Sequence, residues 1–235
     1  MRKIFLFTFI MFHYTAGAQL LKIKSGDTTY LKQLPPVEDA YAPFYDYVTK
    51  DSVFNGQFVV YDPADTNKLF IEGTYRNGLK TGIWKYHFVT GQLQSIVEYT
   101  NNIENGLSIS FEQDGTISCY GQMKDGEGDG EWKIFENNIL SYTGIEKNGK
   151  REGLWKLFDE NGNLKETHSC HENILEGEFR AFYPSGKIMT TGAYHNRVKI
   201  GKWTYYYENG KKKWEEDTAT GKITHWNENG NEVKK

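Results

Sequence analysis

The sequence is poor in cysteine, in proline, in basic charge and in long hydrophobic runs. Its 235 residues include 2 cysteines and 5 prolines, and the formal net charge is -3. A weakly acidic chain lacks the positive field that binding to phosphates requires, so no nucleic-acid partner is expected. Aromatic residues, by contrast, make up 15% of the chain, and glycine occurs 24 times. This combination is typical of an all-β protein with short strands and tight turns.

The main apolar run lies at the N-terminus, over residues 4–12, and is too short to cross a bilayer, which takes about 20 residues. Arg2 and Lys3 precede it, and the small residues 16–18 follow it. The pattern predicts a signal peptide over residues 1–18 that is cleaved before Gln19. The mature chain would be periplasmic or secreted, without an integral membrane segment. Loss of Arg2 and Lys3 would change the net charge from -3 to -5.

Glycines recur along most of the chain at an almost constant interval. Stepping backwards from the last of them, the intervals are 24, 24, 23, 24, 24 and 26 residues. The longest unit carries a longer turn at residues 62–68, and the shortest carries a shorter turn at residues 136–138. The glycines are Gly56, Gly82, Gly106, Gly130, Gly153, Gly177 and Gly201. Such a period indicates a repeat protein.

Aromatic residues hold fixed places in each unit. Six of seven units have one at the second position after the glycine, and six of seven at the fifth. The second positions are Phe58, Trp84, Ser108, Trp132, Trp155, Phe179 and Trp203. The fifth positions are Tyr61, His87, Phe111, Phe135, Phe158, Phe182 and Tyr206. Because side chains alternate along a strand, these two positions predict a sheet with aromatic residues on both faces.

Two turn signals divide each unit into two strand-sized runs. Dipeptides such as Asn77-Gly78 and Asn148-Gly149 favour tight hairpins, because glycine adopts positive φ without a steric clash. A single hairpin cannot bury its apolar surface, so neighbours must stack on it. The sequence therefore predicts an all-β fold, an elongated antiparallel β-meander of about seven stacked β-hairpin repeats of ~24 residues. About fourteen strands would give a sheet on the order of 65 Å long.

The repeated unit resembles a known family. Its pattern G-x-W-K-x-[FY]-x-E-N-G-x-L, ending in Y-x-N-G, is similar to the bacterial MORN repeat variant, and residues 153–163 and 201–211 match it best. The resemblance covers residues 55–235. It implies an elongated sheet of hairpins, a role in protein interaction or scaffolding, and no shared catalytic residues. Some members of this family are described as antitoxin components, which the predicted export signal disfavours here.

The segment between the predicted signal peptide and the repeats has a different character. Residues 19–54 are interrupted by Pro35-Pro36, and residues 41–48 are rich in aromatics. Because the ends of a repeat array need cover, we interpret residues 19–54 as an N-terminal cap, with a flexible leader as the alternative. The repeat domain then occupies residues 55–235.

The histidines and cysteines form no convincing metal site or disulfide in the sequence. In a strand, His168 and Cys170 would share a face while His171 points away, and no fourth ligand is near. Cys119 and Cys170 lie two repeats apart, roughly 19 Å across a flat sheet, whereas a disulfide requires Cα atoms within about 7 Å. We predict free thiols and no metal or cofactor.

No enzymatic motif is present either. Ser, Thr and Cys residues lack a nucleophile motif, and the paired carboxylates fall in turns beside Asn and Gly. We therefore expect a non-enzymatic protein with no catalytic residues.

The aromatic ladder is the remaining feature with functional meaning. It could serve only as a core, or one face could also bind a ligand. The candidate binding residues are Trp84, Trp132, Trp155, Trp203, Tyr205, Tyr207 and Trp214.

Three functions fit this ladder. The first is an exported protein-binding or scaffolding module with a protein partner, located at the cell envelope. The second is a carbohydrate or cell-wall binding module, for which the aromatic run around Tyr205 would be suited. The third is an antitoxin or immunity protein, which follows only from the family resemblance. The surplus aromatics near Trp214 could instead seal the C-terminal end of the sheet.

Overall fold

The computed structural model describes residues 19–25, 28–34, 55–62, 65 and 67–233, with the side chains of residues 19–34 excepted. Within these residues the chain forms 18 strands and no helix, which confirms the predicted all-β class. The chain divides into two compact units, Met1–Leu93 with Tyr99–Asn102 and Gln94–Glu98 with Ile103–Lys235. The predicted signal peptide and the aromatic segment 41–48 lie outside the described residues.

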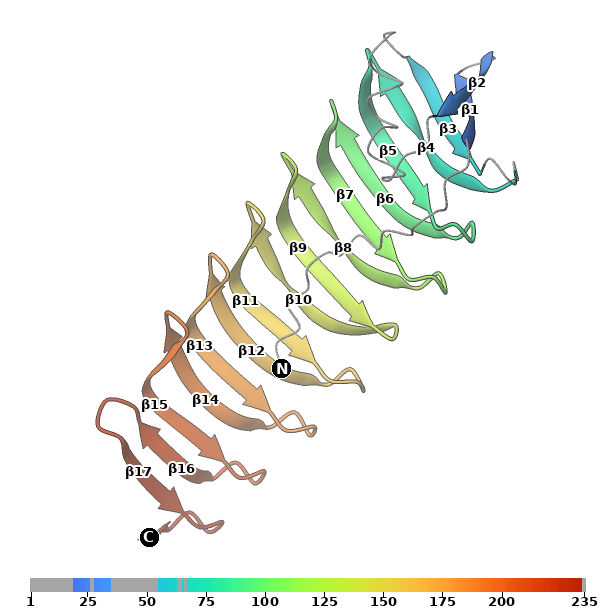
Figure 1. Cartoon of the computed structure of the whole chain (residues 1–235). Coiled ribbons are helices and arrows are strands. Elements are labelled where there is room, and N and C mark those ends of the chain that lie inside the picture. Colours follow the sequence, from blue (N-terminus) through green and yellow to red (C-terminus); the bar gives the residue numbers. More distant parts are fainter. Residues whose placement is uncertain (1–18, 26–27, 35–54, 63–64, 66, 234–235) are drawn as a thin grey trace. The chain divides into compact units, whose positions relative to one another are not determined.

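The first unit is built from hairpins paired in sequence order (Figure 1). Its strands are β1 (Gln19–Ser25), β2 (Thr28–Leu34), β3 (Gly56–Tyr61), β4 (Leu69–Arg76) and β5 (Leu79–His87). β3 pairs with β4 and β4 with β5, always antiparallel. The hairpin of β1 and β2, which the repeat pattern did not predict, adds to β3 through Ile23 opposite Val60.

The second unit continues the same construction with one hairpin per repeat. β6 (Leu93–Thr100) has residues in both units. The later strands are β7 (Ile103–Phe111), β8 (Ile117–Lys124), β9 (Glu127–Glu136), β10 (Ile139–Lys147), β11 (Lys150–Phe158), β12 (Leu164–His171), β13 (Ile174–Phe182), β14 (Ile188–His195), β15 (Val198–Tyr206), β16 (Lys212–Asp217), β17 (Lys222–Trp226) and β18 (Glu232–Val233). β7 to β18 pair antiparallel in chain order, so the predicted meander of consecutive hairpins is confirmed.

From β4 to β15, the strands are joined at one edge of the sheet by tight two-residue turns. In the Asn148-Gly149 turn both residues have positive φ, 49° and 67°, as a two-residue type I′ turn requires. Asn196-Arg197 has the same conformation without glycine, at 48° and 67°. These turns also bond to the preceding repeat, since the backbone N–H of Arg197 donates to the carbonyl of Leu175. These hydrogen bonds connect successive repeats at this edge of the sheet.

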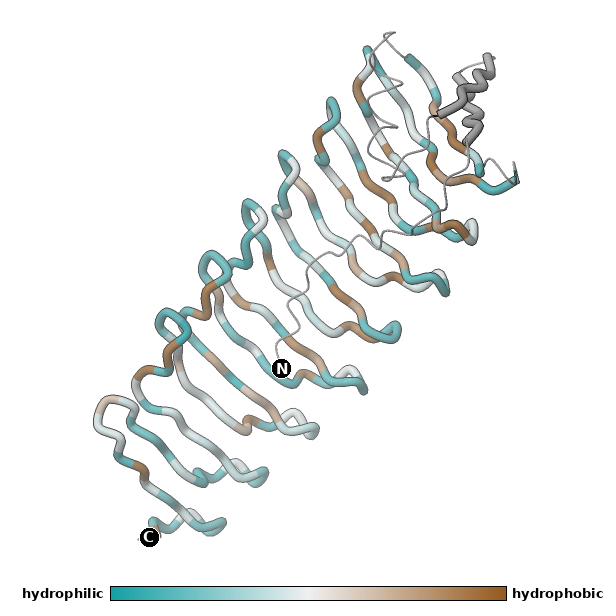
Figure 2. The backbone as a smooth tube through the Cα atoms, viewed as in Figure 1, coloured by the Kyte–Doolittle hydropathy of each residue, from teal (hydrophilic) through white to brown (hydrophobic). Residues whose placement is uncertain are grey.

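Five-residue turns dominate the opposite edge. The N–H of Asp159 donates to the carbonyl of Asn163 at 2.9 Å, and the N–H of Tyr183 to that of Lys187 at 2.8 Å. Between β9 and β10 this turn is replaced by Asn137-Asn138, both with positive φ, which explains the single 23-residue interval. Figure 2 shows polar turns at both edges and apolar residues spaced along the strands between them.

The core consists of aromatic clusters on one face of the sheet, which we call the tryptophan face. In the first unit Trp84 packs against Phe58 and Tyr75, with ring centroids 5.7 and 4.9 Å apart. In the second unit Trp203 packs in the same way against Phe179 and Tyr194, at 5.2 and 5.0 Å. Burying each such ring contributes roughly 4–6 kcal/mol, from 150–250 Å² at about 25 cal/mol per Å². The repeat phase of the aromatics is therefore primarily a packing rule.

Candidate functional site

Three of the predicted binding residues lie in the core. Trp84 and Trp155 are 0% exposed and Trp203 is 2% exposed. The Trp155 indole N–H donates to the carbonyl of Ile145, 3.2 Å away, which satisfies it inside the sheet. A cationic side chain also lies over each ring. Over Trp155 it is Arg151, whose guanidinium carbon is 4.8 Å from the ring centroid. These rings are closed on both sides and offer no open platform to a ligand.

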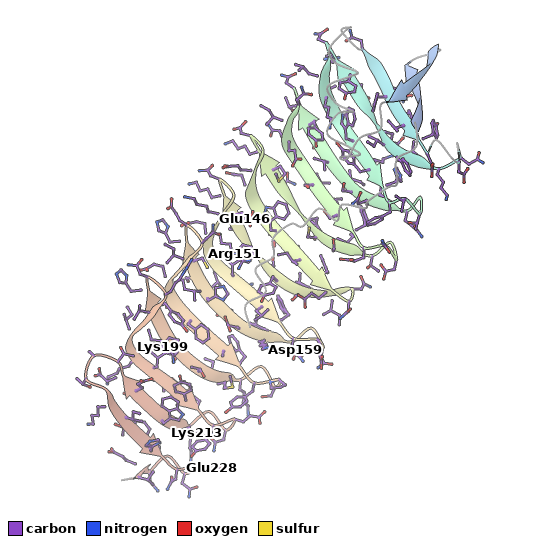
Figure 3. The ribbon with its side chains drawn as sticks, in the orientation of Figure 1. Glu146, Arg151, Asp159, Lys199, Lys213 and Glu228 are labelled. Atoms are coloured by element: carbon purple, nitrogen blue, oxygen red, sulfur yellow. The ribbon has the colours of Figure 1, made fainter. Side chains whose placement is uncertain are left out.

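Trp132 is only half-buried, and its indole nitrogen has no hydrogen-bond partner among the described residues. Its ring lies against Gly121 of the neighbouring strand. A Cβ on Gly128 would come within 2.9 Å of the Trp132 nitrogen and would collide with the Glu146 carboxylate. Burial raises the pKa of Glu146. Figure 3 places Glu146 beside Arg151 at the tight-turn edge, away from Asp159.

The remaining candidates gather in the last strands. Tyr205 of β15 lies opposite Trp214 of β16, and their rings stack with centroids 3.5 Å apart and planes at 12°. The Tyr207 hydroxyl donates to the carbonyl of Trp226 at 3.0 Å. The structure thus brings Trp203, Tyr205 and Trp214 together and leaves the earlier tryptophans in separate repeats.

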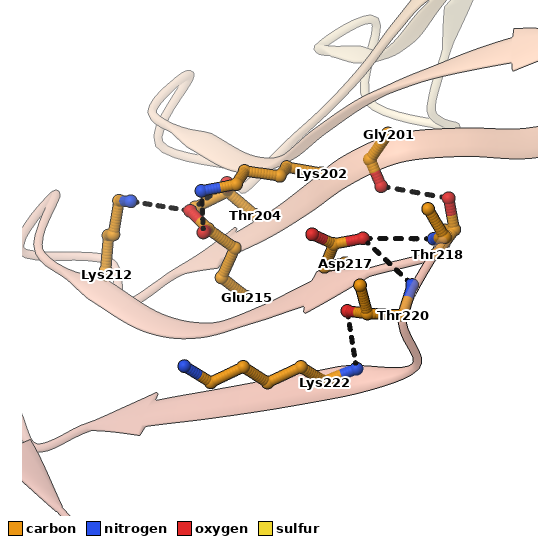
Figure 4. A network of polar contacts seen from close by, with 10 residues as sticks. Gly201, Lys202, Thr204, Lys212, Glu215, Asp217, Thr218, Thr220 and Lys222 are labelled. Carbon is orange, nitrogen blue, oxygen red and sulfur yellow. Dashed lines mark hydrogen bonds and ion pairs between the residues drawn. The ribbon is translucent and has the colours of Figure 1, made fainter.

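A polar network ties the same strands together (Figure 4). The Glu215 carboxylate binds Lys212 at 2.6 Å and Lys202 at 3.2 Å. The hydroxyl of Thr218 donates to the carbonyl of Gly201 at 3.0 Å. Both the stack and the network link β15, β16 and their turns, an arrangement suited to closing the end of a repeat array.

The histidines are arranged as the strand alternation predicted. Nδ1 of His168 lies 2.8 Å from the Glu166 carboxylate, and Nδ1 of His171 lies 3.0 Å from the Glu152 carboxylate. His168 also contacts Cys170, whereas the pair of His171 and Glu152 is exposed. No cluster of three metal-ligating side chains occurs in the described part of the chain. Cys119 and Cys170 are both free, which agrees with the prediction for the two thiols.

A groove at the five-residue-turn edge was not predicted from the sequence. We call it the Asp159 groove; its volume is about 600 Å³. Its apolar floor is formed by Tyr142, Leu157, Phe158, Leu164, Phe182 and Met189. Its charged rim is formed by Glu136, Asp159, Glu160 and Lys165. This volume lies within the range of about 300–1,000 Å³ that is usual for ligand-binding clefts.

Equivalent positions of successive repeats build the groove. Ser141, Lys165 and Met189 line it and are 24 residues apart. Each is the extra residue where the register shifts in its strand: between Leu140 and Tyr142, opposite Leu157/Phe158, and opposite Ala181/Phe182. A bulge re-aims side chains at a strand end, so these shifts bring one residue per repeat to the groove.

The residue at the first turn position differs between the groove and the two repeats that follow it. Tyr183 and Tyr207 occupy the first position of their turns, and each hydroxyl reaches the next repeat, Tyr183 donating to the carbonyl of Tyr206 at 2.7 Å. Asp159 holds the same position one repeat earlier. Its short side chain instead accepts from the N–H of Asn161 and of Asn163, both at 2.9 Å. The space that a tyrosine ring fills in the later repeats is therefore left to the groove.

The rim carries negative charge. The backbone hydrogen bond from Asn163 lowers the pKa of Asp159, so this carboxylate is ionised at neutral pH. Glu136, Glu160 and Lys165 complete the rim, giving a formal charge of three negative and one positive group, or -2. Among the described residues, none of these four forms an ion pair with another side chain. Their charges remain available to a ligand.

None of the described residues belongs to a helix long and apolar enough to span a bilayer. No curated protein sequence matches the chain significantly. A family model, the MORN repeat variant, matches residues 151–169, 175–196 and 199–213. These segments include β11, β13, β14 and β15 and thus two of the repeats that form the Asp159 groove. The resemblance to the MORN repeat variant that the sequence predicted is thus confirmed over residues 151–213.

Proposed function

We propose that this chain is a non-enzymatic protein-binding module that uses the Asp159 groove. The observation that carries the proposal is the groove itself, an apolar floor with a charged rim that forms no ion pair, on a sheet that buries Trp84, Trp155 and Trp203. Sheets of repeat proteins present such surfaces to extended partners. Met189 is 37% exposed at this site, and methionine adapts its shape to different partner side chains.

The groove favours binding over catalysis. Its titratable groups are three carboxylates, one lysine and two tyrosines, and Asp159 is held by its own turn. Ser141 is buried, and no histidine lines the groove to act as its base. The chemistry that these residues offer is ion pairing and apolar contact.

The location proposed for this function is the cell envelope. The basic, apolar and small-residue pattern of residues 1–18 supports export. A partner would then be another exported or envelope protein.

The same geometry does not favour a carbohydrate-binding ladder. Sugar rings need an exposed aromatic face, whereas Trp84, Trp155 and Trp203 are buried. Tyr205 and Trp214 cover one face of each other. We interpret the C-terminal aromatics as an end cap.

Affinity capture with two matched variants tests the proposed function. The chain, tagged at its C-terminus and expressed with its own leader, would be used to capture proteins from an envelope extract. Met189→Asp places a charge on the groove floor, and Val198→Asp makes the same kind of change at an exposed site on the opposite edge, where Val198 is 64% exposed. We expect a partner that the parent and Val198→Asp retain and that Met189→Asp loses. Equal retention by both variants would contradict the proposal.

A further inference from the structure

We propose that the occupant of the Asp159 groove is an extended segment of a partner protein in which Lys or Arg side chains flank apolar ones. This inference rests on the proposed function and specifies the partner's chemistry. It follows from the charge of the rim, the shape of the floor and the presence of Asp159 where the next two repeats have Tyr183 and Tyr207.

The rim selects basic side chains. Glu136 and Glu160 are exposed, and no described side chain neutralises them. Glu136 ends β9 and Glu160 lies in the turn after β11, so a segment crossing the groove meets one carboxylate and then the next. Opposite charges at a partly desolvated rim steer a partner and set its register. Lys165 supplies the only positive charge among the groove-lining side chains and limits the net charge to -2.

The floor selects an extended apolar segment rather than a single small ligand. Tyr142 of β10, Leu164 of β12 and Met189 of β14 come from three successive hairpins. Neighbouring strands lie about 4.8 Å apart, so these three strands span roughly 20 Å. An extended peptide advances about 3.3 Å per residue, and roughly six residues would cross the groove. Alternating side chains of such a peptide would point toward the floor and toward the rim.

The repeat itself provides a variant that closes the groove. In the next two repeats, Tyr183 and Tyr207 fill the position of Asp159 and bond to the following repeat. The turn that begins at Tyr183 has the same backbone hydrogen bond as the turn that begins at Asp159, because the N–H of Tyr183 donates to the carbonyl of Lys187. Asp159→Tyr should therefore be compatible with the fold, and its ring would occupy the space that is open in the parent.

Two peptides test the chemistry of the occupant. Both would be fluorescein-labelled, about eight residues long, with the same Leu and Phe positions and either Lys or Glu at the others. We expect the Lys peptide to bind the full chain about tenfold or more tightly than the Glu peptide at low salt, and the difference to shrink as salt is raised. Asp159→Tyr should weaken the Lys peptide about tenfold or more, with an unfolding midpoint close to that of the parent.

A second variant pair keeps the test independent of the Tyr substitution. Glu160→Gln removes one rim charge with little change in shape and should weaken the Lys peptide by about threefold, as expected for one exposed ion pair. Glu228→Gln, at the same turn position in the last hairpin and outside the groove, should leave binding unchanged. Failure of the Lys peptide to bind, equal binding of both peptides, or equal effects of Glu160→Gln and Glu228→Gln would overturn the inference.

The two proposals fail in different ways. If neither peptide distinguishes the variants but Met189→Asp still loses a captured protein, the groove binds a partner of different chemistry and the protein-binding function stands. If Met189→Asp also retains every captured protein, the proposed function fails as well.

Discussion

The indole ring of Trp155 lies so close over Gly144 that no side chain at residue 144 could be accommodated. A Cβ built on Gly144 would overlap Cδ2 and Cε2 of the indole. The same close contact occurs between Gly73 and Trp84 and between Gly192 and Trp203. At Gly144 and Gly192 the register of the strand pair shifts, so the bulge and the ring contact occur together. Glycine is needed here for close approach, since none of these three has positive φ.

Gly144→Ala is expected to destabilise the chain by about 1–3 kcal/mol, because overpacking a filled core forces the ring or the strand to move. Urea unfolding of the full chain measures this. Trp155→Leu on the Gly144→Ala background should lose less stability than the sum of the single changes, because the smaller side chain relieves the overlap. A Gly144→Ala variant as stable as the parent would refute the packing rule.

Trp203→Ala is expected to cost about 3–5 kcal/mol, as for a fully buried aromatic ring. Trp214→Ala should cost roughly half as much, because Trp214 is only half-buried and its ring is stacked on one face. Thermal or urea unfolding would rank the two variants. A larger loss of stability for Trp214→Ala than for Trp203→Ala would contradict the assignment of Trp203 to the core.

His168 should make stability depend on pH. Burial alone would lower the pKa of His168, but hydrogen bonds with Cys170 and Glu166 outweigh it and raise this pKa to about 9. Protonated His168 therefore stabilises the fold below its unfolded pKa of about 6.5, and the contribution is lost as pH rises through about 9. We expect the stability of the parent to fall relative to His168→Gln between about pH 6 and 10, with a weaker trend in Glu166→Gln. Parallel pH profiles for the parent and His168→Gln would show that this pairing has no energetic role.

Both thiols should be present and slow to react. Cys170 is buried, and burial raises the pKa of the half-buried Cys119, which lowers the fraction of reactive thiolate. We expect two titratable thiols per chain in urea without reductant, and slow labelling of both in the folded protein. Fewer than two thiols in urea would reveal a disulfide that the described geometry lacks.

The sequence was sufficient to predict the fold because two independent signals agree in most repeats. The Asn148-Gly149 type of turn requires positive φ, and the aromatic phase requires a buried face, so hairpin boundaries and sidedness follow together. β3 to β16 supply the fourteen strands expected from seven units. The added hairpin of β1 and β2 lacks the repeat glycine, although its alternating residues could have revealed it.

The groove could not be read from the sequence in the same way. It depends on bulges that bring Lys165 and Met189 to one edge, and a bulge leaves no distinct residue type in the chain. The one available signal was the change from the acidic Asp159 to Tyr183 and Tyr207 at a fixed repeat position. Three of the seven candidate residues chosen from aromatic content, Trp84, Trp155 and Trp203, are core positions, because the sheet buries these large rings.

Site-specific photo-crosslinking at residue 189 tests the central claim most directly. A photoreactive phenylalanine analogue would replace Met189 in the full chain, and the control would place it at Val198, which is exposed at the opposite edge. Irradiation in envelope extract should give a discrete protein adduct from position 189 that Asp159→Tyr suppresses, and none from position 198. No adduct at position 189, or the same adducts at both positions, would contradict a binding role for the Asp159 groove.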